Sequence, residues 1–412
     1  MANLKLSAPE LMELENKYGA HNYHPLPVVL ERGENVFVWD VDGKKYFDFL
    51  SAYSAVNQGH CHPKIIKTLV DQAQKLTLTS RAFYNSQLGR YEEFITQFFG
   101  FEKVLPMNTG AEAVETAIKL CRKWGYEIKC LPENSAQIIV CANNFHGRTT
   151  TIVSFSVDHD AYNHYGPFTP GFIVIPFNDC NALEKVLNEN LNIAGFLVEP
   201  IQGEAGAAVP DDGYLKKCHE LCRQHNVLFI ADEIQTGIAR TGKLLACDYE
   251  DVKPDILILG KALSGGAYPV SAVLSNHEIM NLIHPGQHGS TFGGNPLAAA
   301  VAISALEVIR DEKLAENAFE LGEIFRTEMR SICEKSNIAS FVRGKGLLNA
   351  LIVNNDGRVN LAWDICLKLL DNGLLAKPTH TNIIRFAPPL IITKQQLFEC
   401  VEIIRKTIIS FE

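Results

Sequence analysis

The sequence has no excess of basic residues and no long apolar run. Its 38 lysines and arginines are outnumbered by 47 acidic residues, and the formal net charge is −9. This balance argues against a protein that binds nucleic acid or an anionic membrane. The longest apolar stretch, residues 296–309, contains Ser304 and Glu307 and is too short to span a bilayer. We therefore expect neither a nucleic-acid partner nor a membrane association.

The N-terminus also lacks the apolar core of a secretory signal. It carries Glu10, Glu13 and Glu15, unlike an acid-poor transit peptide. The eleven cysteines are scattered and odd in number, so without an export signal we interpret them as reduced thiols. These features predict a cytoplasmic protein, or one of the mitochondrial matrix if a presequence has been removed.

Motifs for nucleotides are missing, and those for metals are weak. There is neither a G-x-G-x-x-G fingerprint nor a Walker loop, so a nucleotide-binding protein has no support. The run HCH at residues 60–62 lies in a loop-like segment, where adjacent side chains point in opposite directions. Cys218, Cys222 and His225 share a helical face, but thiols packed onto a sheet explain that face better. We predict no metal site.

What the sequence does contain is an alternation of apolar strands and amphipathic helices. The chain has 412 residues, 47% of them hydrophobic, which is ample for a large core. Strands rich in Val, Ile and Leu are predicted at residues 137–144, 172–177, 194–200, 227–233 and 255–260. Helices are predicted between them, at residues 111–126, 183–189 and 214–225. This order is typical of an α/β protein with a mostly parallel sheet covered on both faces.

The two ends of the chain have a different pattern. After a short helix the first 35 residues read as irregular; a hairpin around Asp42-Gly43 follows at residues 36–50, then a loop to residue 63 and a helix to about residue 75. Beyond the helix at residues 296–309, helices and strands suggest a smaller α+β domain. The strands there are predicted at residues 343–353 and 382–390, and the helices at residues 314–331, 362–371 and 394–410. We predict three segments: an N-terminal segment of residues 1–60 that contributes to the small domain, a large domain of residues 61–310 and a small domain of residues 311–412.

One stretch organises the candidate site, namely DILILGKALSGGAYP at residues 255–269. A buried-strand run ends at Gly260, and Lys261 follows directly. Poor solvation there disfavours the ammonium form and lowers the pKa of the amine, which makes it a nucleophile able to form a Schiff base with an aldehyde. Taken alone, the stretch is better explained by a lysine that extends from a strand end into water. Other motifs have to decide between a Schiff-base lysine and a solvated one.

Two of these motifs suit a planar, nitrogen-containing ring. Asp232 closes the apolar run VLFIADE, and an ionised acid at the end of a buried strand needs a partner such as a protonated ring nitrogen. The alternative is a carboxylate that caps the next turn. Phe145 follows another strand and could stack on a ring, with ordinary hydrophobic packing as its alternative.

Two further motifs suit a phosphate group. The run TGAEA at residues 109–113 joins a loop to a helix N-terminus, where free N–H groups and the helix dipole attract anions. The run STFGGNP at residues 290–296 offers two hydroxyls, Ser290 and Thr291, followed by glycines; its alternative is a flexible loop. A phosphate cradle, a stacking ring, an acid and a Schiff-base lysine are what pyridoxal 5′-phosphate requires, so their joint occurrence predicts this cofactor.

These motifs also carry a family resemblance, which extends from Tyr18 nearly to the C-terminus. ADEIQTGIARTG and the residues 257–266 resemble the class III pyridoxal-phosphate aminotransferases of fold type I. HNYHPLP, SAYSAVNQGHCHP, LTLTSRAFYN, VEPIQGEAG, GQHGSTFGGNP and RGKGLLNA resemble more closely the branch that transaminates ornithine. The resemblance implies a homodimer with shared active sites, possibly a higher oligomer.

The resemblance also implies a role for each cofactor residue. Lys261 would be the Schiff-base lysine and proton shuttle, and Asp232 the partner of the pyridine nitrogen. The other implied cofactor contacts are Phe145 on the ring, Gln235 by the phenolic oxygen, Gly110 and Ala111 at the phosphate, and Ser290 and Thr291 at the phosphate, with Thr291 reaching that of the neighbouring subunit.

The implied substrates are L-ornithine, which would lose its δ-amino group as glutamate-5-semialdehyde forms, and 2-oxoglutarate. Tyr23 and Arg148 would hold the α-amino and α-carboxylate groups of ornithine, and Tyr53 would line the pocket. Glu204 would pair with Arg385 until 2-oxoglutarate binds to that arginine. Two solvated surface charges are the alternative for this pair.

Three questions stay open at this point. The amine could instead be acetylornithine or 4-aminobutyrate, although the polar partner that Tyr23 offers to a free α-amino group argues against both. The chain could also bind the cofactor without catalysis, which the intact Lys261, Asp232 and Arg148 argue against. Finally, His146 stands where animal relatives tend to have a larger aromatic residue, so packing near Arg148 is expected to differ.

Overall fold

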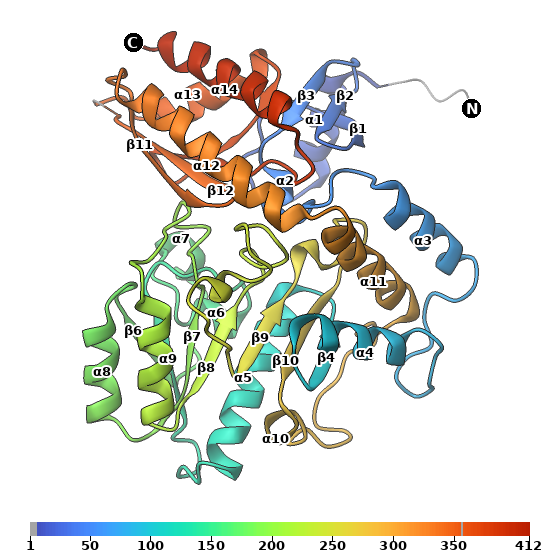
Figure 1. Cartoon of the computed structure of the whole chain (residues 1–412), viewed down its shortest axis with the longest axis vertical. Helices are drawn as coiled ribbons and strands as arrows, with labels where there is room; N and C mark the ends of the chain where they lie inside the picture. The colour runs from blue at the N-terminus through green and yellow to red at the C-terminus, as the bar shows by residue number, and fades with distance from the viewer. Residues whose placement is uncertain (1–5, 356) are drawn as a thin grey trace.

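The computed structural model describes residues 6–355 and 357–412 and contains three β-sheets. A seven-stranded sheet with helices on its faces fills the lower half of Figure 1, and two four-stranded sheets with the C-terminal helices form the upper half. The predicted class, a mixed α/β protein with a large sheet and a smaller domain, is confirmed. Across the described residues, every helix is too short or too polar to cross a bilayer.

The large sheet has the order β4-β10-β9-β8-β7-β5-β6. Its strands are β4 (Lys103–Met107), β5 (Gln137–Cys141), β6 (Phe172–Ile175), β7 (Ile193–Val198), β8 (Leu228–Asp232), β9 (Ile256–Leu259) and β10 (Ser271–Ser275). The five strands from β6 to β9 pair in parallel, whereas β10 is antiparallel to both of its neighbours. Every residue of β7, β8, β9 and β10 is buried, which explains their uninterrupted apolar runs.

Helices connect these strands and cover the sheet. They are α3 (Pro63–Ala73), α4 (Leu88–Phe99), α5 (Gly110–Glu127), α6 (Thr150–Val153), α7 (His159–Tyr162), α8 (Cys180–Glu189), α9 (Tyr214–Gln224), α10 (His277–Met280) and α11 (Pro296–Asp311). The helix α5 packs on β7, β9 and β10, and its predicted apolar face, which includes Val114, Ile118 and Trp124, is buried there. A capping box between Thr109 and Glu112 fixes where α5 begins.

The second sheet, β11-β12-β15-β14, is antiparallel. It comprises β11 (Ala339–Lys345), β12 (Leu348–Val353), β14 (Lys377–Thr379) and β15 (Ile383–Phe386), next to α12 (Leu314–Cys333), α13 (Leu361–Asp371) and α14 (Lys394–Ile409). The single strand predicted over residues 343–353 is wrong, because the chain reverses at Gly346. That residue has φ +53, and a Cβ there would come within 2.2 Å of the carbonyl carbon of Thr241. Only glycine fits such a close approach.

The third sheet joins the two ends of the chain. It contains β1 (Leu30–Glu34), β2 (Phe37–Asp40), β3 (Lys45–Asp48) and β13 (Leu374–Leu375), and it follows α1 (Ala8–Tyr18). The predicted hairpin is present as β2 and β3, but β1 lies where irregular structure was expected. The parallel pairing of β3 with β13 supports our proposal that residues 1–60 belong with residues 311–412.

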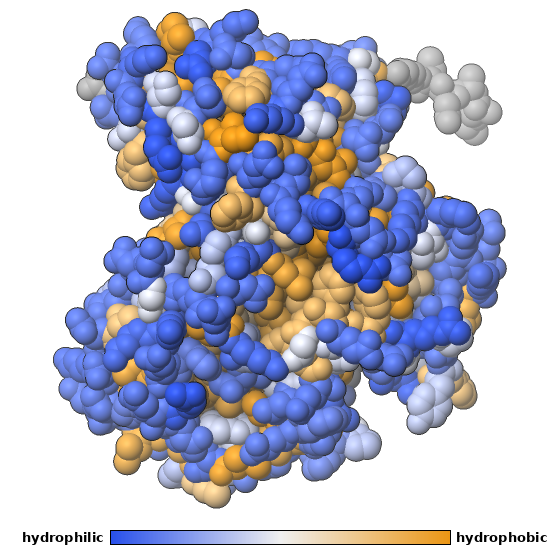
Figure 2. Space-filling model, viewed as in Figure 1, coloured by the Kyte–Doolittle hydropathy of each residue, from blue (hydrophilic) through white to orange (hydrophobic). Residues whose placement is uncertain are grey.

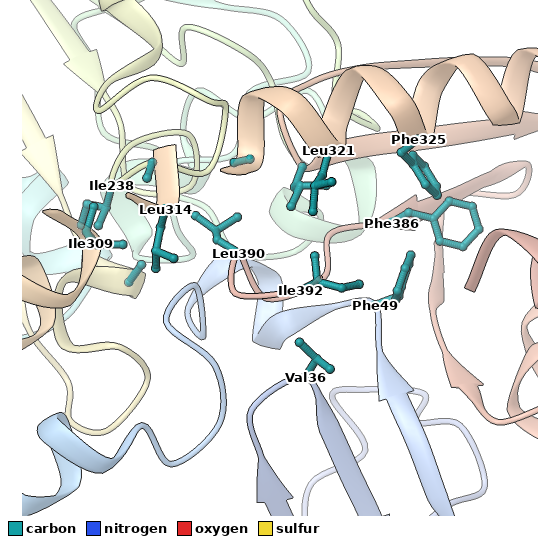
Figure 3. Packing of buried hydrophobic residues seen from close by; sticks show 14 of the residues in the cluster. Val36, Phe49, Ile238, Ile309, Leu314, Leu321, Phe325, Phe386, Leu390 and Ile392 are labelled. Carbon is teal, nitrogen blue, oxygen red and sulfur yellow. The ribbon is translucent and has the colours of Figure 1, made fainter. Parts of the chain in front are cut away.

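A continuous apolar core connects the halves. Figure 3 shows Ile238 and Ile309 beside Leu314, followed by Leu390 and Ile392 and then by a group of aromatic rings. The rings of Phe49, Phe325 and Phe386 lie 5.8–6.2 Å apart in tilted or edge-on pairs. Because β15 ends at Phe386, this packing also fixes the position of its neighbour, Arg385.

Candidate active site

A cavity of about 210 Å³ opens at the carboxyl ends of β5, β7, β8 and β9. This is where ligands bind to open parallel sheets. Its lining combines residues that are far apart in sequence: Gly110, Ala111, Phe145, His146, Gly147, Glu199, Glu204, Asp232, Ile234, Gln235, Thr236 and Lys261. Seven of the predicted site residues are among them. The motifs that the sequence suggested separately therefore meet at one place.

Lys261 lines this cavity and does not extend into bulk water. It follows β9 and Gly260 and opens a short 3₁₀ turn, η2 (Lys261–Ser264), with φ +44. Such a left-handed backbone is unfavourable for a residue with a Cβ, and strained backbone of this kind is enriched at active sites. Burial, together with the charge of Arg385, lowers the pKa of the Lys261 amine, although Glu204 opposes the shift. A lowered pKa makes more of the free-base amine available.

Asp232 has a partner that sequence reasoning did not assign to it. Its Oδ2 lies 2.6 Å from Nδ1 of His146, while its Oδ1 accepts a hydrogen bond of 3.1 Å from the N–H of Ile234. Asp232 thus also caps the turn that follows it, which was its alternative role. Burial alone would lower the pKa of His146, but the hydrogen bond and charge of Asp232 outweigh it and raise the pKa. His146 therefore holds the Asp232 carboxylate in place, and does not merely occupy the position of a larger aromatic residue.

Glu199 is a second residue that sequence reasoning missed. This buried acid accepts hydrogen bonds from the N–H of Phe145 at 2.9 Å and of Gly203 at 3.4 Å. Burial raises the pKa of Glu199 to about 7, against the opposing effect of His146. The signal was its place in VEP at the end of a buried strand, equivalent to that of Asp232 in ADE.

The features of the cavity fit a planar ring that carries a phosphate. The structure shows no hydrogen bond to the N–H groups of Gly110 and Ala111 among the described residues, so the N-terminus of α5 can receive an anion. A Cβ at Gly110 would come within 3.0 Å of Ile234, which leaves glycine as the best fit. Phe145 faces the cavity and stays 36% exposed. The buried Oε1 of Gln235 has no partner in the described chain and is free to bind a ligand.

Ser290 and Thr291 do not line this cavity. The hydroxyl of Ser290 accepts hydrogen bonds from Asn108 at 2.8 Å and from the N–H of Gly293 at 3.0 Å, whereas Thr291 is exposed. Their expected contact with a phosphate in a neighbouring subunit stays a prediction.

The pair Glu204–Arg385 is formed and lies beside Lys261. Their Oε1 and Nη1 atoms are 2.5 Å apart, and Nε2 of Gln235 donates to the same oxygen at 3.3 Å. Arg385 is only 4% exposed, so it is not a solvated surface charge. Burial would raise the pKa of Glu204, but the charges of Arg385 and Lys261 lower it overall. The carboxylate is therefore ionised and neutralises the arginine.

Tyr53 reaches this pair from an unusual turn. Residues Ser51–Ser54, expected to be a loop, have φ values of +49, +46, +60 and +72, which is a single left-handed turn without glycine. Asp48 stabilises its start by accepting hydrogen bonds of 2.9 Å from the N–H groups of Leu50 and Ser51. The turn places the ring of Tyr53 4.7 Å from the guanidinium of Arg385.

Arg148 and Tyr23 are both exposed and do not line the cavity. The guanidinium of Arg148 lies 5.7 Å from the ring of Phe145, at the edge of the cavity. Tyr23 is 68% exposed, and its ring lies 5.9 Å from Nζ of Lys377, which stands opposite Arg385 in the sheet. Their roles in substrate binding stay predictions.

A fold with this sheet, and a lysine, an acid and an anion site at its carboxyl edge, defines a pyridoxal-phosphate enzyme. The family description Aminotransferase class-III matches residues 18–408. The chain belongs to the class III aminotransferases, whose cofactor is pyridoxal 5′-phosphate.

Three individual relatives show which aminotransferases the chain is similar to. The mitochondrial ornithine aminotransferase of Drosophila ananassae is 64% identical over 96% of this chain and 90% of its own length. A crystal structure of acetylornithine aminotransferase from Elizabethkingia anophelis is also 64% identical, with a TM-score of 0.91 over 98% of this chain and 100% of that one. Ornithine aminotransferase from Toxoplasma gondii, solved with partial occupancy of PLP at its active site, is 49% identical, with a TM-score of 0.96 over 98% and 94%.

Proposed function

We propose that this chain transfers the δ-amino group of L-ornithine to 2-oxoglutarate, giving glutamate-5-semialdehyde and glutamate. The observation that carries the proposal is the ion pair between half-buried Glu204 and buried Arg385 next to Lys261. A cavity that must accept first an amine donor and then a dicarboxylate needs an arginine that can be covered and uncovered. An acid that neutralises Arg385 during the first half-reaction meets this need. The names of the relatives support the choice of ornithine.

The residues divide the chemistry among them. The bound cofactor supplies an electron sink that acidifies the carbon next to the transferred nitrogen. Nζ of Lys261 would take the proton from Cδ of ornithine, because its lowered pKa keeps more of the amine in the free-base form that can accept a proton. Asp232, held by His146, would stabilise a positive charge at the ring nitrogen, and the N–H groups of Gly110 and Ala111 would bind the phosphate.

A second candidate substrate is N-acetylornithine, because a structure of equal identity comes from an acetylornithine aminotransferase. The two amines differ at the α-nitrogen, which is a cation in ornithine and a neutral amide in its acetylated form. Tyr23 is the residue expected to recognise the cation.

The test is an absorbance titration of the holoenzyme with L-ornithine, N-acetylornithine and 4-aminobutyrate in separate single-turnover reactions. We expect ornithine to convert the cofactor band fastest, and 2-oxoglutarate to restore it. A faster reaction with N-acetylornithine would contradict the proposal. A spectrum that responds to none of the three would favour a chain that binds the cofactor without catalysis.

Glu204→Gln is expected to affect the two half-reactions differently. Without the carboxylate, Arg385 is free to bind the α-carboxylate of ornithine in an unproductive orientation, so kcat/KM for ornithine should fall about tenfold or more. The KM for 2-oxoglutarate should stay equal or decrease, because its binding site is already uncovered. Single-turnover kinetics with each substrate measure both effects. Glu189→Gln, at an exposed position of α8, is the matched control; equal losses in both half-reactions would contradict a switching role.

We also infer a homodimer. Large apolar side chains remain exposed, among them Phe83 (70%), Tyr84 (104%) and Phe292 (48%), and Figure 2 shows apolar surface gathered in the hollow between the two halves. Thr291, next to Phe292, would then reach the partner's cofactor. Sedimentation equilibrium of the holoenzyme tests the stoichiometry.

Two cellular locations are considered, the cytoplasm and the mitochondrial matrix. The Drosophila relative is named as mitochondrial, which supports the matrix alternative, whereas cytoplasm was the first expectation from sequence. Fractionation of cells that express the natural gene distinguishes the two.

A further inference from the structure

The loop between α10 and α11 carries Ser290 and Thr291, and it is fastened to the first turns of α5. One attachment is Asn108, whose amide nitrogen lies 2.8 Å from the hydroxyl of Ser290 and 2.8 Å from a carboxylate oxygen of Glu112. The loop is therefore aligned with the same helix N-terminus that forms the phosphate site of this chain.

The second attachment is His288, beside a hydrogen bond of 3.3 Å from Nζ of Lys119 to the carbonyl of Gln287. Its Nδ1 lies 2.9 Å from Nζ of Lys119, and its Nε2 lies 2.8 Å from the hydroxyl of Thr116. An ammonium group can only donate, so Nδ1 must be the acceptor and Nε2 must carry the proton. The hydroxyl oxygen of Thr116 accepts the hydrogen bond from Nε2–H, and the same hydroxyl donates to the carbonyl of Glu112 at 2.7 Å. The chain of hydrogen bonds is complete only while the imidazole is neutral.

We propose that neutral His288 is a positioning residue that holds the loop on α5, and that its protonation releases the loop and weakens cofactor binding. The proposal rests on the proposed function in one respect: Thr291 would contact the cofactor of the neighbouring subunit. A released loop would then lower the occupancy of that subunit's site.

The surrounding charges set the direction of the pH effect. Burial and the facing ammonium of Lys119 lower the pKa of His288, and the charge of Glu112 opposes them only partly. In a released loop the imidazole would have its ordinary pKa of about 6.5. The attachment is therefore at full strength above that value, and it weakens as the pH falls from there through the lowered pKa of the attached state. Below the lowered pKa of the attached state, the loss of attachment strength no longer grows.

Two variants on this contact should both weaken the pH dependence. His288→Gln does not titrate and can still donate to Thr116, so its affinity for pyridoxal 5′-phosphate should show the smallest change with pH. Lys119→Gln removes the repelling charge, which brings the pKa of the attached imidazole closer to its ordinary value, so the loop attachment should depend less on pH than in wild type. The control variant is Lys123→Gln, because Lys123 lies on the same helix and pairs with Glu127, away from the loop. It should behave as wild type.

The measurements are the dissociation constant of pyridoxal 5′-phosphate and amide hydrogen exchange of residues 284–293, both between pH 8 and pH 5.5. Because only the attached loop completes the site, we expect the dissociation constant of wild type to rise about threefold or more over this range. The exchange rates, corrected for intrinsic pH dependence, should increase in parallel. Titrations of the cofactor itself are common to all variants and cancel in the comparison.

Two results would overturn the proposal: loop exchange in wild type that is independent of pH, or His288→Gln with the full pH dependence of wild type. Failure of the proposed function is distinguishable. An enzyme inert toward ornithine at pH 8, but with the expected loop exchange and cofactor affinities, would refute the reaction and leave the role of His288 intact.

Discussion

Lys261→Ala is expected to reduce the rate of both half-reactions by about 10³-fold or more, since it removes the group that moves the proton. The amine lies in the cavity with a lowered pKa and a left-handed backbone, and no other lysine lines the cavity in the described chain. Stopped-flow absorbance with ornithine and with 2-oxoglutarate measures each step separately.

A matched control for this variant is Lys253→Ala, an exposed lysine whose ammonium donates to the carbonyl of Gly100. It should retain the wild-type rate. Circular dichroism and the melting temperature of Lys261→Ala establish that the variant is folded. A near-normal rate in the folded variant would refute the proposed mechanism. Partial recovery on addition of a small primary amine would strengthen it, because a free base in solution would replace the missing one.

Asp232→Asn is expected to produce the second-largest loss, about 10²- to 10³-fold in kcat, because it removes a charge-stabilising group aimed at the reacting system. The shape of the side chain is kept, but a neutral amide cannot stabilise a proton on the ring nitrogen. The loss should appear in both half-reactions and in the absorbance maximum of the bound cofactor. Asp251→Asn, at an exposed left-handed position that asparagine tolerates, is the control.

His146 makes this prediction more specific. With Asp232 neutral, burial would dominate and the imidazole would lose its bound proton, so the variant should keep its fold and lose mainly catalysis. His146→Phe should retain more activity than Asp232→Asn, because the charged carboxylate is still present and is still held by the N–H of Ile234. If His146→Phe were the more damaging change, Asp232 would not be the group that acts on the ring.

The main elements of the site could be predicted because each follows a strand whose burial is visible in the sequence. Lys261 and Asp232 come after runs of four or five apolar residues, and parallel strands bring their carboxyl ends to one edge. The helix at Gly110 was similarly visible from its apolar face.

What could not be predicted depends on contacts between distant segments. The pairing of His146 with Asp232, or the burial of Glu199, follows from the register of β5, β7 and β8, which no local pattern contains. The left-handed turn at Tyr53 has no glycine to signal it and depends on hydrogen bonds to Asp48. The reversal at Gly346 was hidden in an apolar run because its cause is a close approach to Thr241.

The pairing of β3 with β13 has a consequence for how the protein is made. A ribosome synthesises β3 early and β13 only after residue 373, so the edge of the N-terminal sheet is unpaired through most of translation. An open edge can pair with other chains, and contacts between remote segments form slowly. The N-terminal hairpin is thus open to mispairing while the chain is being made, and Arg385, which follows β13, is among the last site residues to reach its place.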